Sequence, residues 1–215
     1  MKPLSVMRFV IYGAVGFGIG WAVLGVLGGG FPMAGGVGTV LGGAIFSGDL
    51  PALLLYMPVL SLSGAFGGAA LGLALKDFRR VVILAVLGAV GFFLGSFIVV
   101  GLFFSLSFMQ VGYGLLEALC AAALGVVVGA LLSLSIRRFR GTVILALMGL
   151  VAFGIGGVVA AALQGFPLQP SEVLPSLQSA AFGAVEGIIG GALLGATLAY
   201  LEDRKSAQEL RPRVR

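Results

Sequence analysis

The basic residues of this chain are confined to its two ends and to two short segments between long apolar stretches. The thirteen lysines and arginines are Lys2, Arg8, Lys76, Arg79, Arg80, Arg137, Arg138, Arg140, Arg204, Lys205, Arg211, Arg213 and Arg215. Loops rich in Lys and Arg stay on the cytoplasmic side of a membrane, so an even number of crossings should separate successive clusters. Three hairpins meet this condition and predict six transmembrane spans with both chain ends in the cytoplasm.

The composition favours a membrane protein over a soluble one. Apolar residues make up 60% of the chain and charged residues 10%, whereas roughly a quarter of the residues of a soluble domain are charged. The mean hydropathy is +1.17. The positive net charge does not indicate nucleic acid, because the cations lie at span ends, where they meet anionic lipid headgroups, and do not form a continuous stripe for phosphates.

Apolar stretches of about 20 residues place the spans near residues 9–29, 52–75, 81–104, 114–136, 142–163 and 177–200. We expect an all-α, polytopic helix bundle with one transmembrane domain over residues 1–205 and a basic cytoplasmic tail over 206–215. The first stretch is too long for the apolar core of a signal peptide, so we expect it to remain as a span. Residues 30–50 are apolar and rich in glycine, and an interfacial or re-entrant segment is one interpretation of them.

The chain also repeats a two-helix unit. Residues 76–95 and 137–156 are identical at ten of twenty positions without a gap. Residues 13–17 resemble residues 88–92, and residues 67–72 resemble residues 190–195. These matches predict three circularly shifted pseudo-repeats, at approximately 50–105, 112–165, and 177–205 together with 1–29. Hairpins of even span number insert with the same orientation, which permits a pseudo-threefold axis along the membrane normal.

Glycines at intervals of four residues line one face of several spans. In lipid, such glycines allow helix backbones to approach closely. The predicted packing residues are Gly64, Gly68 and Gly72 in the second span, Gly125 and Gly129 in the fourth, and Gly183, Gly187, Gly191 and Gly195 in the sixth. These ladders either hold a monomeric bundle together or mediate an oligomer, and they place the second, fourth and sixth spans near the centre.

Glu186 is the polar residue that most requires an explanation, because it lies about ten residues into the sixth span and hence near mid-membrane. An ionised carboxylate there costs several kcal/mol unless it is paired, hydrated or protonated. Helical geometry places Ser179 and Thr197 on the same stripe, which is a candidate polar path. The alternative is a carboxyl group that hydrogen-bonds neighbouring helices together. The counterparts of Glu186 in the other repeats are Ser63 and Leu124.

Glu117 is a further candidate for the polar path, early in the fourth span. Close to the outer boundary a carboxylate can reach headgroup water, so we expect Glu117 to be solvated. Asp49 and Glu172 fall in the outer connections, where no cation accompanies them. An acidic outer face would modestly concentrate cations near an entrance.

The inventory of reactive side chains is small. The chain contains no histidine, so a Ser-His-Asp triad or a histidine-ligated zinc site cannot be built. Cys120 is the only cysteine and excludes an intrachain disulfide. We therefore expect no enzymatic activity, no cofactor and no metal site.

Two hypotheses for function remain. The first is a small channel or permease for a cation, a proton or a small solute, and the second is a non-catalytic membrane subunit or scaffold that packs through its glycine faces. The expected partners are the lipid bilayer, with anionic headgroups at the basic inner rim, and a second copy or another membrane protein, but not nucleic acid. The expected location is a prokaryotic cytoplasmic membrane, with multiple spans and both termini cytoplasmic.

Overall fold

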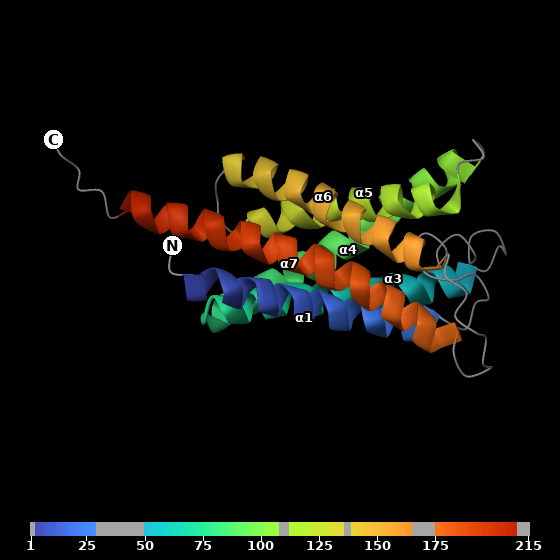
Figure 1. Cartoon of the computed structure of the whole chain (residues 1–215), viewed down its shortest axis with the longest axis horizontal. Coiled ribbons are helices and arrows are strands. Elements are labelled where there is room, and N and C mark those ends of the chain that lie inside the picture. Colours follow the sequence, from blue (N-terminus) through green and yellow to red (C-terminus); the bar gives the residue numbers. More distant parts are fainter. Residues whose placement is uncertain (1–2, 29–49, 108–111, 136–138, 165–174, 210–215) are drawn as a thin grey trace.

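The computed structural model describes residues 3–28, 50–107, 112–135, 139–164 and 175–209, and every regular element in these ranges is an α-helix. The helices are α1 (Pro3–Gly28), α3 (Leu50–Ala74), α4 (Phe78–Ser107), α5 (Tyr113–Ser133), α6 (Phe139–Gln164) and α7 (Pro175–Glu209) (Figure 1). Each of the six is long and apolar enough to cross a membrane. The described residues thus form an all-helical fold, and the six apolar helices indicate a multi-pass membrane protein, as predicted.

Several helices extend beyond the predicted ends of their spans. Helices α4 and α6 begin before the predicted spans and include basic residues, and α7 continues to Glu209, into the first residues assigned to the tail. Charged side chains end a membrane span but leave the backbone hydrogen bonds intact, so a helix can continue into water beyond it. The segment 30–50, for which a re-entrant path was considered, lies outside the described residues except for Leu50.

The six helices form a closed ring. The most extensive contacts join α1 to α7, α5 to α6, and α3 to α4, and smaller contacts join α1 to α3, α4 to α5, and α6 to α7. Each helix therefore has one close and one looser neighbour. The apolar windows of α3, α5 and α7 are 50%, 56% and 56% buried, against 44%, 33% and 39% for α1, α4 and α6.

In each of the three close helix pairs, a glycine of one helix lies directly against a glycine of the other, so that the two backbones are in contact. A methyl group added to one glycine would overlap the carbonyl group of the other, in both directions. These reciprocal pairs are Gly64 with Gly88, Gly125 with Gly149, and Gly13 with Gly191. One turn away, Gly68, Gly129 and Gly195 face the carbonyl groups of Leu84, Leu145 and Phe9. Close approach without side chains between them maximises van der Waals contact, which helices in lipid depend on.

The turn between α3 and α4 is short and well defined. Lys76 adopts a left-handed backbone conformation with φ of 57°, which ends α3. Asp77 then caps α4, since its Oδ1 accepts a hydrogen bond of 3.0 Å from the backbone N–H of Arg79. The two helices are therefore held as an antiparallel pair.

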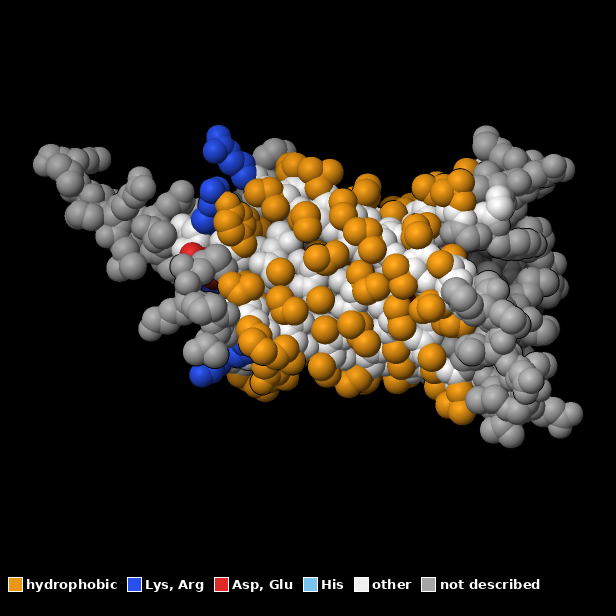
Figure 2. All heavy atoms as spheres, viewed as in Figure 1, with side chains coloured by type: hydrophobic (Ala, Val, Ile, Leu, Met, Phe, Trp, Pro, Cys, Tyr) orange, Lys and Arg blue, Asp and Glu red, His pale blue; other side chains and the backbone are white. Residues whose placement is uncertain are grey.

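The outer surface of the bundle matches a bilayer. Figure 2 shows hydrophobic side chains over the flank of the bundle, with Lys and Arg side chains gathered at one end. This is the end at which α1 begins and α7 ends (Figure 1). The described chain therefore has an apolar belt bounded on one side by cations.

Candidate functional site

Glu186 lies on the inner side of α7 and is 1% exposed. The neighbouring helix α6 leaves room for it at Gly156, where an added methyl carbon would lie only 3.1 Å from Cγ of Glu186. Its Oε1 has no hydrogen-bond partner among the described residues. A buried carboxyl oxygen that lacks a partner is costly, so its retention inside a bundle requires an explanation.

Glu117, on α5, is the second buried carboxyl group, and the expectation that it is solvated was wrong. It is 5% exposed. Helix α6 covers this part of α5 closely, because an added methyl carbon on Gly157 would lie 3.0 Å from Cα of Ala118. Gly156 of α6 packs against Glu186, and the next residue, Gly157, packs against Ala118 beside Glu117, so both acids approach the same turn of α6. The fold thus brings together two acids that are far apart in the sequence.

The remaining members of the predicted polar path are not gathered at this place. Thr197 is buried, but its hydroxyl donates a hydrogen bond of 2.8 Å to the carbonyl oxygen of Leu193 in its own helix. It lies three turns from Glu186, or roughly 16 Å along α7. Ser179 belongs to α7, and its side chain lies outside the described part of the structure. The described site therefore consists of Glu186 and Glu117.

A cluster of four aromatic rings fills the interior beside these carboxyl groups. Phe17, Phe92 and Phe153 come from α1, α4 and α6, and their ring centroids lie 5.7 to 6.4 Å apart. Trp21 lies 6.0 Å from Phe92 and 6.1 Å from Phe153. All four are at most 1% exposed. We call these four residues the aromatic cluster, and it closes the axis of the bundle at the depth of Glu186.

Trp21 connects the aromatic cluster to the carboxyl site. An added methyl carbon on Gly187, the residue after Glu186, would lie 2.8 Å from Cδ1 of Trp21. The indole Nε1 of Trp21 is buried and has no hydrogen-bond partner among the described residues. Two buried groups without a described partner therefore lie on either side of α7, the indole N–H of Trp21 where α7 meets α1 and the Oε1 of Glu186 where α7 meets α6.

Sequence reasoning did not single out the aromatic cluster, although a signal was present. Phe17 and Phe92 occupy the same place in the matching segments 13–17 and 88–92, and Phe153 matches Phe92 in the aligned segments 76–95 and 137–156. Because these three phenylalanines fall at matching positions of three segments, the sequence predicts that their rings contact one another near the axis of the bundle. Trp21 has no such signal, because its counterparts are Ser96 and Gly157.

Among the described residues, no group of three or more Cys, Asp or Glu side chains is arranged to hold a metal ion. No family model matches this chain, and neither a curated protein nor a solved structure does so.

Proposed function

We propose that this protein is a small permease or channel for a proton, a small cation or another small solute, and that Glu186 binds the species that crosses. The observation that carries this proposal is the Glu186 carboxyl group, buried in a membrane-spanning helix with an oxygen that no described residue satisfies. Intramembrane acids typically mark ion or proton pathways. The nearby Glu117 adds a second carboxyl group, which favours a positive species.

The size of the species is limited by the number of polar groups. A permeating solute exchanges its hydration shell for groups of the protein, and the described part of the interior offers two carboxyl groups and few hydroxyls. A proton or a small monovalent cation fits that supply better than a large polar solute. Because the aromatic cluster fills the axis, passage requires its rings to move, and the described conformation is a closed one.

We assign the bundle three pseudo-repeats, α3 with α4, α5 with α6, and α7 with α1, packed through glycines. The alternation of close and looser helix contacts and the three reciprocal glycine pairs support this assignment. In these pairs Gly191 corresponds to Gly64 and Gly125. The sequence alignment instead matches Gly191 to Gly68 and Gly129, which lie one helical turn further along their helices. By these contacts the counterparts of Glu186 are Val59 and Cys120 rather than Ser63 and Leu124, and the site is still asymmetric.

We place both termini in the cytoplasm, in a prokaryotic cytoplasmic membrane. The basis is the positive-inside rule applied to the whole sequence. The described cations at one end of the bundle support this orientation (Figure 2). We also propose that the chain is not an enzyme and needs no cofactor, since it lacks histidine, and that its partners are lipid and a second copy or another membrane protein, but not nucleic acid.

The second candidate is a non-catalytic subunit or scaffold. Its supporting observation is the same aromatic cluster, because an axis filled by four buried rings is also what a purely structural bundle would have. In that case the Glu186 carboxyl group serves only to join helices. The two candidates differ in what the loss of its charge should do.

The test compares Glu186→Gln and Glu186→Leu in proteoliposomes, with flux measured for protons, monovalent ions and small neutral solutes and melting temperature measured on the same preparations. Gln retains shape and hydrogen-bonding capacity, so permeation predicts a folded protein whose flux of the positive species is lost. Glu202→Gln is the matched control, since this acid lies at the cationic end and pairs with Arg80 at 3.0 Å. A well-folded Glu186→Gln protein with native flux, or a native protein without flux for any of these species, would leave the scaffold as the better proposal.

A further inference from the structure

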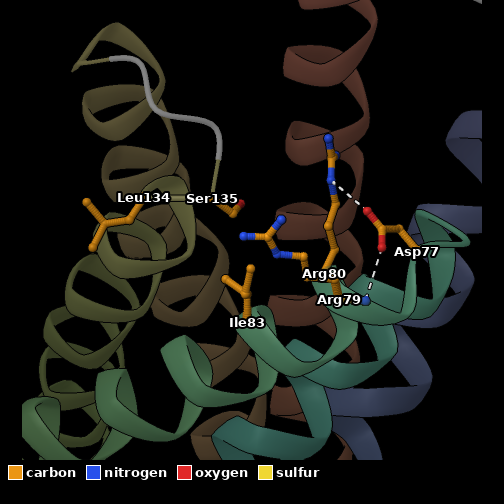
Figure 3. A pocket seen from close by; sticks show the side chains of 6 residues that line it. All are labelled: Asp77, Arg79, Arg80, Ile83, Leu134 and Ser135. Atoms are coloured by element: carbon orange, nitrogen blue, oxygen red, sulfur yellow. Dashed lines mark hydrogen bonds and ion pairs between the residues drawn. The ribbon is translucent and has the colours of Figure 1, made fainter.

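A pocket of 350 Å³ opens at the cationic end of the bundle, away from Glu186. It lies between the beginning of α4 and the residues that follow α5 (Figure 3). Its lining residues are Asp77, Arg79, Arg80, Ile83, Leu134 and Ser135. The two sides come from different predicted repeats, so the pocket is a seam between units.

Of the two arginines that line the pocket, Arg80 forms ion pairs with described residues and Arg79 does not. Asp77 pairs through Oδ2 with Nε of Arg80 at 3.6 Å, and Arg80 reaches Oε1 of Glu202 on α7 at 3.0 Å. The other oxygen of Asp77 caps the backbone of α4. The guanidinium of Arg79 has no hydrogen-bond or ion-pair partner in the described part of the chain, and in Figure 3 it points across the pocket toward Ser135. The pocket therefore presents one arginine, Arg79, whose guanidinium makes no ion pair with a described residue.

The remaining wall is apolar. Ile83 lies one turn deeper along α4 than Arg79, on the same side of the helix. Leu134 lines the pocket from the end of α5, and in Figure 3 its side chain points away from Ile83. Ile83 and Leu134 are 40% and 54% exposed. The pocket thus changes from cationic at the end of the bundle to apolar toward the belt of Figure 2. A phosphate followed by a glycerol and an acyl chain has the same order of polarity.

We propose that this pocket binds the phosphate of an anionic phospholipid through Arg79, with the glycerol and the start of an acyl chain against Ile83 and Leu134. Guanidinium groups bind phosphate oxygens through two parallel N–H donors, which gives strength and direction. Ser135 contributes only as an acceptor or by packing, because its hydroxyl already donates to the carbonyl oxygen of Leu132 at 2.7 Å. The inference stands on this pocket alone and does not depend on permeation through Glu186.

The test titrates phosphatidylglycerol or phosphatidylcholine into the detergent-purified full chain and follows the rise in melting temperature, which yields an apparent affinity. For Arg79→Gln we expect phosphatidylglycerol to bind at least about tenfold more weakly, as loss of a charged hydrogen bond implies. Arg79→Lys should fall between the native chain and Arg79→Gln. Arg140→Gln is the matched control, since it removes an exposed arginine at the start of α6 that does not line the pocket. It should bind the lipid within about twofold of the native chain.

Two results would overturn the assignment. Equal weakening by Arg79→Gln and Arg140→Gln, or by neither, would mean that the lipid responds only to overall charge. Saturation of the same effect by inorganic phosphate or glycerol 3-phosphate at the same concentration as the lipid would mean a site for a soluble phosphate. Both variants replace exposed side chains, so their melting temperatures without lipid should be native and the comparison remains interpretable.

Discussion

Placing a methyl group in the contact between α5 and α6 should destabilise this bundle, although alanine is the better helix former. At Gly125 the added carbon would overlap the carbonyl oxygen of Gly149 and lie 2.6 Å from its carbonyl carbon. At Gly149 the reverse overlap occurs, with 2.7 Å to the carbonyl carbon of Gly125. Backbone atoms cannot rotate away from a clash, so either substitution must separate the two helices.

The size of the effect follows from two opposing terms. Exchanging Gly for Ala inside a helix gains about 1 kcal/mol of helix propensity. Overpacking a close contact costs typically about 1–3 kcal/mol, and the upper part of this range applies where the obstacle is backbone. We therefore expect Gly125→Ala to lower the free energy of unfolding by about 2 kcal/mol, or the melting temperature by about 4–8 °C. Gly101→Ala is the control, because nothing lies within 4 Å of its added carbon.

The assay is thermal unfolding of the purified protein in detergent, for both single variants, their double variant and the control. Gly101→Ala should be as stable as the native chain or more so. The double variant should lose less than the two single losses combined, since the first methyl group already separates the helices. If Gly125→Ala melted at the same temperature as Gly101→Ala, the backbone contact would not exist in the folded protein.

Two further predictions concern other parts of the bundle. Ser63→Ala should lower stability by about 1 kcal/mol, because the buried hydroxyl donates a hydrogen bond of 2.7 Å to the carbonyl oxygen of Gly20 on α1, and chemical unfolding in mixed micelles would measure it; a native unfolding free energy would contradict this. Reporter fusions after Arg80 and after Arg140 should both report the cytoplasm in whole cells, and an external report at Arg140 would overturn the proposed topology.

The sequence was sufficient to predict the helices but not all of their contacts. The position of the cations and the length of the apolar stretches can be read directly from the sequence. The predicted spans agree with the helices to within three residues, apart from the start of α1 and the end of α7. Glu186 was identified as a candidate site residue from the sequence, because an acid in the middle of a transmembrane span is expected to face the interior of the bundle. The burial of Glu117 was missed, because it depends on the packing of α6 over this part of α5, where Gly157 faces Ala118, 39 positions earlier in the chain.

The contacts among the rings of the aromatic cluster could not be predicted from the sequence for a similar reason. Phe92 and Phe153 were visible as matching positions, but their meeting with Phe17 depends on α1 closing the ring against α7. The sequence alignment also matches Gly191 to Gly68 and Gly129, whereas in the glycine contacts Gly191 takes the place of Gly64 and Gly125, one turn away. Short apolar segments align almost equally well at a shift of one turn, since the glycine ladder itself repeats every four residues.

The most direct test of the central proposal measures flux through a bundle with a smaller aromatic cluster. Phe153→Leu replaces a fully buried ring next to Trp21 by a smaller side chain and should increase the flux of protons or monovalent cations in proteoliposomes. Phe97→Leu, the control, removes a 51% exposed ring and should not change the flux. Adding Glu186→Gln to Phe153→Leu should return the flux to that of protein-free vesicles. A folded Phe153→Leu protein with no more flux than the native chain, or a double variant that keeps the increase, would contradict passage along the axis by way of Glu186.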